Sequence, residues 1–80
     1  MVTIIPSSKF KKSVKHLDPN SREKLEKIIK KIISNPEIGK PLKYYRGERS
    51  LRIKPFRLIY SYKNNILYLL KFEHRKEVYD

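Results

Sequence analysis

The sequence contains no cysteine, so the chain can form neither a disulfide nor a thiolate metal site. This fits a reducing compartment, and we expect a cytoplasmic protein. The longest unbroken apolar run, Ile66 to Leu70, is far shorter than the roughly 18 residues that a membrane-spanning helix needs. The first residues, MVTIIPSSKF, have no basic stretch before the apolar ones and no small-residue cleavage site, so we expect no signal peptide.

Acidic residues are also scarce, because eight Asp and Glu stand against twenty Lys and Arg, for a formal net charge of +12. A composition bias can enrich lysine, but an excess of this size favours binding to polyanions. We therefore expect a nucleic acid or ribonucleoprotein partner, together with or in place of an acidic protein. Five of the six arginines lie in the second half of the chain. Since the planar guanidinium group matches phosphate geometry, we expect the functional site there.

Eighty residues are enough for one domain, which we expect to span 1–80. In the first half, the apolar spacing predicts two amphipathic helices. Ser7 or Ser8 can cap the first helix, and Asp18-Pro19 is typical of the start of the second. Asn35-Pro36 ends the second helix. Two such helices in succession favour an antiparallel hairpin laid on a sheet.

From Leu42 onward the apolar period changes to two, which predicts β-strands. The predicted strands are 42–45, 49–54, 56–62 and 66–72, in addition to a first strand at 2–5. Asn64-Asn65 favours a tight hairpin turn, because asparagine tolerates positive φ. The fold class is therefore α+β: an N-terminal strand, a two-helix antiparallel hairpin, and an antiparallel meander of three to four strands that the helices cover on one face.

Two arginines, Arg52 and Arg57, are predicted to lie opposite each other in the hairpin around Pro55. Only an even loop sets apolar residues opposite apolar ones, and the same register places the two arginines side by side. Because Pro55 cannot adopt positive φ, we expect a loop of four residues or a looser one. Like charges in this position repel by about 1 kcal/mol or less, so the pair indicates an anion-binding role.

The face of the sheet away from the helices is predicted to combine this arginine pair with an apolar patch. Register through the Asn64-Asn65 turn places Tyr60 and Tyr62 in the core, and Arg57 beside Phe72 on the other face. His74 is expected to continue on that second face. An uncovered apolar patch indicates a docking surface, whereas the competing interpretation is a solvated face with scattered apolar residues. The patch comprises Ile59, Tyr68, Leu70 and Phe72.

Several short motifs, taken in order, resemble the RelE/ParE toxin superfamily, and its RelE-type branch most closely. They cover nearly the whole chain: Phe10-Lys11-Lys12 with Leu17, Asn35-Pro36 before Gly39-Lys40-Pro41-Leu42, Leu51-Arg52-Ile53-Lys54 with Phe56-Arg57-Leu58-Ile59-Tyr60, and His74-Arg75-Lys76-Glu77-Val78-Tyr79. The family usually has a glycine in the turn where this chain has Pro55. The resemblance implies a type II toxin that cuts mRNA in the ribosomal A site and is silenced by a cognate antitoxin.

The resemblance also implies catalytic roles for particular residues of this chain. Arg52 and Lys54 match the basic pair of the penultimate hairpin, and Arg57 matches the active-site arginine. Tyr79 matches a tyrosine near the C-terminus, and Arg75 approximates a second basic residue there.

Cleavage of RNA by its own 2′-OH needs a base, charge stabilisation at the phosphate, and an acid for the leaving oxygen. Arg52, Lys54 and Arg57 suit the phosphate, but they do not supply proton transfer. Histidine is the side chain that titrates near neutral pH, and His74 is the histidine predicted near this cluster. The sequence is equally compatible with a catalytic role for His74 and with no chemical role. A site so equipped fits an enzyme that relies on the ribosome to position its substrate. We expect no metal and no cofactor.

Other basic residues are expected to contact RNA: Lys9, Lys12, Lys43, Arg46, Arg49 and Lys76. The apolar patch is expected to bind an acidic or amphipathic segment of the antitoxin, with an affinity that falls as salt rises. We expect the free toxin to be a monomer that joins a higher-order complex with antitoxin. Two alternatives stay open: a ParE-like inhibitor of DNA gyrase without nuclease activity, and a degenerate toxin that only binds RNA and antitoxin.

Overall fold

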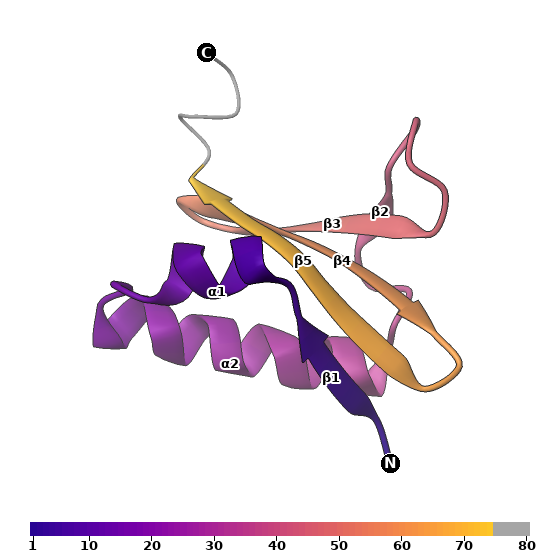
Figure 1. Ribbon diagram of the computed structural model, residues 1–80, viewed down its shortest axis with the longest axis horizontal. Helices are drawn as coiled ribbons and strands as arrows, with labels where there is room; N and C mark the ends of the chain where they lie inside the picture. Colours follow the sequence, from indigo (N-terminus) through magenta and orange to yellow (C-terminus); the bar gives the residue numbers. More distant parts are fainter. Residues whose placement is uncertain (75–80) are drawn as a thin grey trace.

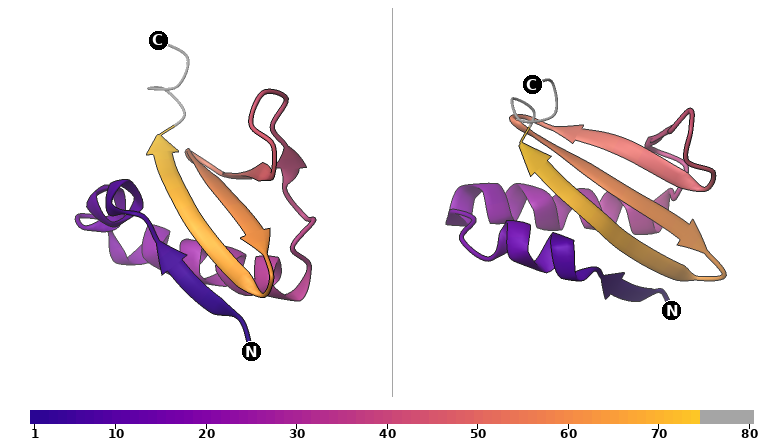
Figure 2. Two further views of the ribbon diagram at one scale, coloured as in Figure 1. Left: turned by 45° about the vertical axis from the view of Figure 1, so that its right-hand side comes forward. Right: turned by 45° about the horizontal axis from the view of Figure 1, so that its top comes forward.

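The computed structural model describes residues 1–74, which form two helices packed on one side of a sheet (Figure 1). Two further views show the same arrangement, with no described helix on the other side of the sheet (Figure 2). The predicted α+β fold, with helices on one face, is therefore confirmed. The elements are β1 Thr3–Pro6, α1 Ser8–Val14, α2 Pro19–Ser34, β2 Lys40–Pro41, β3 Glu48–Ile53, β4 Phe56–Lys63 and β5 Ile66–His74.

The strands form one mixed sheet in the order β1-β5-β4-β3-β2. Strands β3, β4 and β5 make the predicted antiparallel meander. Strand β1 runs parallel to β5, with Thr3 opposite Ile66, so the first strand of the chain lies beside the last described one. The two helices lie between β1 and the meander in the chain, and both pack on the same face of the sheet (Figure 1).

Local sequence signals set the ends of the helices as predicted. The Ser7 hydroxyl accepts a hydrogen bond from the Phe10 N–H at 3.0 Å, which caps α1. The Asp18 carboxylate accepts one from the Ser21 N–H at 3.2 Å and caps α2, where Pro19 opens the first turn. Hydrogen bonds from the Ser21 hydroxyl and from the Ser21 backbone N–H hold the pKa of the Asp18 carboxyl below its usual value.

The hydrophobic core lies between the helices and the sheet. Phe72 stacks on Phe56, with ring centres 4.6 Å apart, and meets Phe10 of α1 edge-on at 6.3 Å. Tyr60 is fully buried and Tyr62 packs against the core, as predicted for both. The buried core residues are Phe10, Leu25, Ile32, Ile53, Leu58, Tyr60, Leu67, Leu69 and Phe72.

The predicted strand at 42–45 is wrong, because β2 ends at Pro41. Leu42 still donates its N–H to the Glu48 carbonyl, but the next residues form bends and a turn that closes at Gly47, whose φ is +79°. Tyr44 and Tyr45 are 82% and 60% exposed. The alternating apolar residues of 42–45 therefore do not pack against the core, and no strand forms.

The two hairpin turns follow different geometries. Asn64 and Asn65 have φ values of 53° and 62°, which is the tight turn that the sequence predicts. At the other hairpin, Ile53 lies opposite Phe56, so the loop has two residues rather than the predicted four or more. The Lys54-Pro55 peptide bond is cis, and a turn with a cis proline at its third position needs no residue with positive φ.

A β-bulge in β5 determines which face each later residue of the strand occupies. Tyr60 lies opposite Leu69 as predicted, but Ile59 lies opposite Lys71, so Leu70 is an extra residue without a partner. Each residue beyond the bulge therefore points to the face opposite to the one that simple alternation predicts.

Two predicted positions are corrected by this bulge. Phe72 lies opposite Leu58 and is 4% exposed, so it belongs to the core and not to the second face. His74 lies opposite Phe56, and the two rings meet edge-on at 5.4 Å on the helix-covered face. Glu73, instead of Phe72, lies across from Arg57.

Candidate anion-binding site on the open face

The face of the sheet away from α1 and α2, here called the open face, carries the arginine pair. Arg52 of β3 lies directly opposite Arg57 of β4, which confirms the predicted register. Directly opposed residues of antiparallel strands point to the same face, so the two guanidinium groups share the open face. Their repulsion is offset when an anion binds between them. The pair is therefore a candidate phosphate site.

Arg57 is half-buried, and its Nε atom is enclosed without a hydrogen-bond partner in the structure. An unpaired buried donor costs about 1–3 kcal/mol, and more where the group is charged. Glu73 lies opposite Arg57, but among residues 1–74 the one ion pair within 4.0 Å joins Lys27 and Glu23 on α2. Glu73 therefore faces the guanidinium group without neutralising it through a direct contact.

Two lysines that the sequence analysis did not select also occupy the open face. Lys40 of β2 lies opposite Ser50, which is two residues from Arg52 along β3 and so on the same face. Lys71 lies opposite Ile59 because of the bulge. Two cross-strand rows result, Lys40–Ser50–Ile59–Lys71 and Arg52–Arg57–Glu73. We call Lys40, Arg52, Arg57 and Lys71 the cation cluster.

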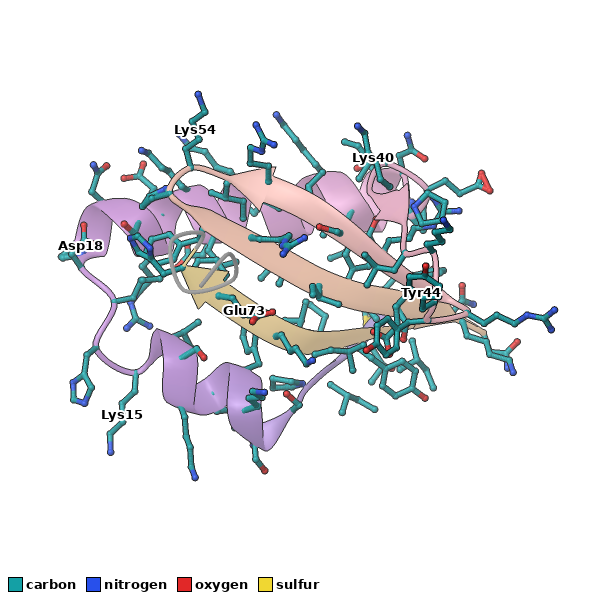
Figure 3. The ribbon with its side chains drawn as sticks, turned by 90° about the horizontal axis from the view of Figure 1, so that it is seen from above. Lys15, Asp18, Lys40, Tyr44, Lys54 and Glu73 are labelled. Atoms are coloured by element: carbon teal, nitrogen blue, oxygen red, sulfur yellow. The ribbon has the colours of Figure 1, made fainter. Side chains whose placement is uncertain are left out.

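Figure 3 looks onto the open face and shows how its labelled residues are distributed. Glu73 projects over β5, and Lys40 lies at the opposite edge of the sheet, beside β2. Lys54 projects from the turn that joins β3 to β4, beyond the arginine pair, and is exposed. His74, which points to the helix-covered face, is not brought together with the cation cluster.

The open face contains two depressions. The first has a volume of about 530 Å³, within the usual range of roughly 300–1,000 Å³ for ligand pockets, and both arginines line it. Its lining residues are Ile38, Lys40, Pro41, Leu42, Ser50, Leu51, Arg52 and Arg57. The second lies at the other end of the face, where Tyr68 and Leu70 line it together with Arg46, Gly47, Glu48, Ser61, Tyr62 and Lys63.

The residues predicted to contact RNA do not gather in one place. Lys9 and Lys12 are exposed on α1, in the helix layer. Lys43 and Arg46 are exposed between β2 and β3. Arg49 has a structural task, because its guanidinium donates to the backbone carbonyls of the 35–39 loop that follows α2.

Three predicted residues, Arg75, Lys76 and Tyr79, lie outside the described residues, and their roles stay predictions.

Of the predicted antitoxin-binding residues, Tyr68 and Leu70 are half-buried on the open face. Ile59 lies on the same face but is only 7% exposed, which leaves little surface for a partner. Phe72 offers none, since it belongs to the core.

Within residues 1–74, no group of three or more histidine and acidic side chains converges on a possible metal position. In the same part of the chain, no helix has the length and apolarity needed to cross a membrane.

Solved structures of bacterial and archaeal toxins share this fold. The chain superposes on a chain of the intact E. coli RelBE toxin–antitoxin complex with a TM-score of 0.82 at 16% identity, covering 92% of this chain and 96% of that one. The RelB–RelE complex of Methanococcus jannaschii gives 0.77 at 21% identity, covering 95% of each chain. The E. coli DinJ–YafQ complex gives 0.77 at 22% identity, covering 100% of each. At these identities the likeness establishes the fold.

The family follows from the sequence itself. A family model described as the ParE toxin of the type II toxin–antitoxin system parDE matches residues 4–79. The chain therefore belongs to this family, within the RelE/ParE superfamily of type II toxins. No curated protein sequence matches it.

Proposed function

We propose that this toxin is an endoribonuclease that cleaves mRNA in the ribosomal A site. The observation that supports this most directly is the arginine pair, Arg52 and Arg57, on an open sheet face with the Arg57 Nε unpaired. Two guanidinium groups held side by side can bind the oxygens of one phosphate, which a single exposed cation does less well. The site would act in the cytoplasm, where ribosomes are found, within one domain over residues 1–80.

In the proposed reaction the RNA supplies its own nucleophile. The 2′-oxygen attacks the adjacent phosphorus and the bond from phosphorus to the 5′-oxygen breaks, which leaves a 2′,3′-cyclic phosphate and a 5′-hydroxyl. One proton leaves the 2′-OH and one is delivered to the 5′-oxygen. Negative charge grows on the phosphate between these events, and Arg52 and Arg57 would stabilise it. Removal of one such donor typically costs about 100-fold to 1,000-fold in rate.

Glu73 is the residue that we assign to the proton of the 2′-OH. It lies on the open face across from Arg57, and a carboxylate can act as a general base when it is within hydrogen-bond reach of the hydroxyl. His74, predicted for proton transfer, lies on the other face. Tyr79 and Arg75, which the family resemblance brings to the site, stay candidates for the leaving oxygen. Binding on the ribosome would supply the alignment that this small set of groups lacks.

The nuclease is tested by mapping mRNA ends in a translation extract with the wild-type protein and with Arg57→Ala. The wild-type protein should cut within codons, and Arg57→Ala should cut at least about 100-fold more slowly. Lys30→Ala, on the exposed surface of α2, is the control for a change in net charge and should cut normally. Equal cutting by wild type and Arg57→Ala contradicts the proposal.

A cognate antitoxin is the proposed protein partner. The RelBE, RelB–RelE and DinJ–YafQ structures are toxin–antitoxin complexes of proteins with this fold, which supports such a partner here. We place its apolar contacts at Tyr68 and Leu70, and its acidic contacts at the cation cluster. Affinity should therefore fall by an order of magnitude or more between 0.1 M and 1 M salt. An affinity that 1 M salt leaves unchanged argues against the acidic contacts.

Inhibition of DNA gyrase is the second candidate, because the matching family model is that of a ParE toxin. A gyrase inhibitor should block supercoiling in a purified reaction and leave mRNA intact in the extract. A degenerate toxin should do neither. Loss of toxicity in Arg57→Ala with normal ribosome binding would argue against a toxin that only binds.

A further inference from the structure

The first depression on the open face is lined by both basic and apolar side chains. Its basic lining residues are Lys40, Arg52 and Arg57. Ile38 and Leu42 are among its apolar ones, and Ile38 is 39% exposed although it is a large apolar residue. A nucleotide presents both kinds of group, a charged phosphate and a flat, largely apolar base face.

The loop that carries Ile38 and Lys40 is fixed from beneath. The buried Tyr60 hydroxyl accepts a hydrogen bond from the Gly39 N–H at 2.9 Å and donates one to the Pro36 carbonyl at 2.8 Å. A Cβ on Gly39 would lie 2.8 Å from that hydroxyl oxygen, so only glycine fits at this distance. The depression is therefore held in shape before any ligand arrives.

A second clamp acts on the same loop from its edge. The Arg49 guanidinium donates to the Gly39 carbonyl at 2.8 Å and to the Glu37 carbonyl at 3.2 Å. The Arg49 guanidinium is thus hydrogen-bonded to the backbone next to Lys40, whereas Lys40 itself lines the depression. Both clamps act on the residues that flank Ile38, which explains how an apolar side chain is kept at the surface.

Lys40 extends the basic surface of the arginine pair toward the edge of the sheet. Ser50 lies two residues from Arg52, roughly 6.6 Å along the strand, and Lys40 lies opposite Ser50 on the next strand. With neighbouring strands about 4.8 Å apart, the Lys40 backbone lies roughly 8 Å from that of Arg52. The flexible lysine side chain can cover part of this distance. A second phosphate of a strand bound at the arginines can therefore reach Lys40, where the Ser50 hydroxyl can also donate a hydrogen bond.

We propose that this depression is a nucleotide subsite for single-stranded RNA, next to the phosphate held by Arg52 and Arg57. The neighbouring phosphate binds Lys40 and Ser50, and the attached base lies against Ile38 and Leu42. The subsite deepens the proposed nuclease function and rests on it for the identity of the strand as RNA. Binding to it does not require cleavage.

The subsite is tested with a short 2′-O-methyl RNA, which lacks the nucleophilic hydroxyl and cannot be cut. Its affinity for the free protein is measured by fluorescence anisotropy at several salt concentrations. Lys40→Ala should weaken binding about fivefold or more and lower the slope of log affinity against log salt by about 0.7, the value for one lost phosphate contact on a single strand. Lys63→Ala, an exposed lysine of β4 at the far end of the sheet, should change affinity less than twofold.

The apolar residues of the subsite are tested with their own pair of variants and their own probe. Ile38→Ser should weaken RNA binding about threefold or more without changing the salt slope. Ile4→Ser is the matched control, because Ile4 on β1 is 41% exposed and lies outside the depression. An abasic strand of the same length should bind more weakly than the RNA and should not distinguish Ile38→Ser from wild type.

Three results would overturn the subsite: no binding of the RNA by the wild-type protein, equal effects of each variant and its control, or an abasic strand that binds as tightly as the RNA. The nuclease proposal fails separately, when mRNA stays intact in the extract. Selective loss of RNA binding in Lys40→Ala and Ile38→Ser supports the subsite even in that case. Normal cutting by wild type combined with unselective binding overturns the subsite alone.

Discussion

The two faces of the sheet use the same strands for opposite purposes. On the helix-covered face, residues such as Leu58 and Phe72 are buried in one continuous apolar core. On the open face, the residues that alternate with these core residues along β3 and β4 place like charges side by side and leave the Arg57 Nε unpaired. One face thus lowers the free energy of the fold, while the other raises it locally. Structures retain such unfavourable groups where a ligand compensates for them.

Neighbouring residues of β4 give the sharpest test of this comparison. Leu58 is fully buried, so Leu58→Ala should lower the free energy of unfolding by about 2–5 kcal/mol. Arg57→Ala should leave stability unchanged or raise it by up to about 1 kcal/mol, because it removes a like-charge contact, while cleavage falls at least about 100-fold. Urea denaturation and mRNA mapping measure the two effects. A large loss of stability in Arg57→Ala would show that the arginine serves the fold.

Glu73 allows a test in which binding and activity move in opposite directions. Glu73→Gln removes a negative charge beside the arginines, so affinity for the uncleavable RNA should rise about twofold to threefold. Loss of the general base should lower cleavage by about 100-fold. Anisotropy and mRNA mapping report these two quantities separately.

The control for Glu73→Gln is Glu48→Gln, at the far end of the open face opposite Ser61. It should change neither quantity by more than about twofold. If Glu73→Gln lowers binding and cleavage together, Glu73 orients Arg57 and is not the base. If binding rises and cleavage is unaffected, Glu73 has no part in the reaction.

The sequence predicts the arginine pair because the core residues around it force the register. Leu51 with Leu58 and Ile53 with Phe56 can pair only if Arg52 and Arg57 do so as well. The helix caps and the asparagine turn were predictable for a similar reason, since each depends on residues adjacent in the sequence.

The faces of Phe72 and His74 were predicted wrongly, although the sequence contains a signal. Strict alternation beyond Leu69 would point Lys71 and Glu73 into the core, where unpaired charges are costly. The consecutive Leu69-Leu70 pair offers an extra residue, and a bulge there returns both charges to the open face. The cost of burying a charge was thus the missing criterion.

No local pattern reveals the subsite at Lys40. Its position depends on Gly39, which the Tyr60 hydroxyl contacts from 21 residues further along the chain. The cis bond before Pro55 is likewise not specified by spacing. Contacts between distant segments and the choice of peptide isomer are the parts that the sequence leaves open.

Tyr60→Phe would measure how much the hydrogen bonds of the buried Tyr60 hydroxyl contribute to stability and to the position of Lys40 on the open face. The variant leaves the Gly39 N–H and the Pro36 carbonyl without their partner, so the free energy of unfolding should fall by about 1–3 kcal/mol. The difference in RNA affinity between wild type and Lys40→Ala should also shrink in this background, because Lys40 is less well positioned. Tyr62→Phe is the control. Its hydroxyl donates to the exposed Asn65 side chain at 3.2 Å, and its loss should cost less than about 0.5 kcal/mol.

The smallest expected effect is on stability and concerns Asp18, the N-cap of α2 in the helix layer. The folded-state pKa of Asp18 lies below that of a free aspartate carboxyl, so its charge stabilises the fold at pH values above the unfolded-state pKa. This contribution is lost as pH falls through the folded-state pKa. Asp18→Ala should therefore be slightly less stable than wild type near pH 7, and the difference should narrow as pH falls below about 4. Asp18→Asn keeps the cap without the charge, so it should lie near wild type at neutral pH and lose the pH dependence. Urea denaturation across pH follows both variants. RNA binding should be normal in each, since Asp18 lies at the start of α2, away from the open face; a change in RNA affinity would show that the two faces are coupled.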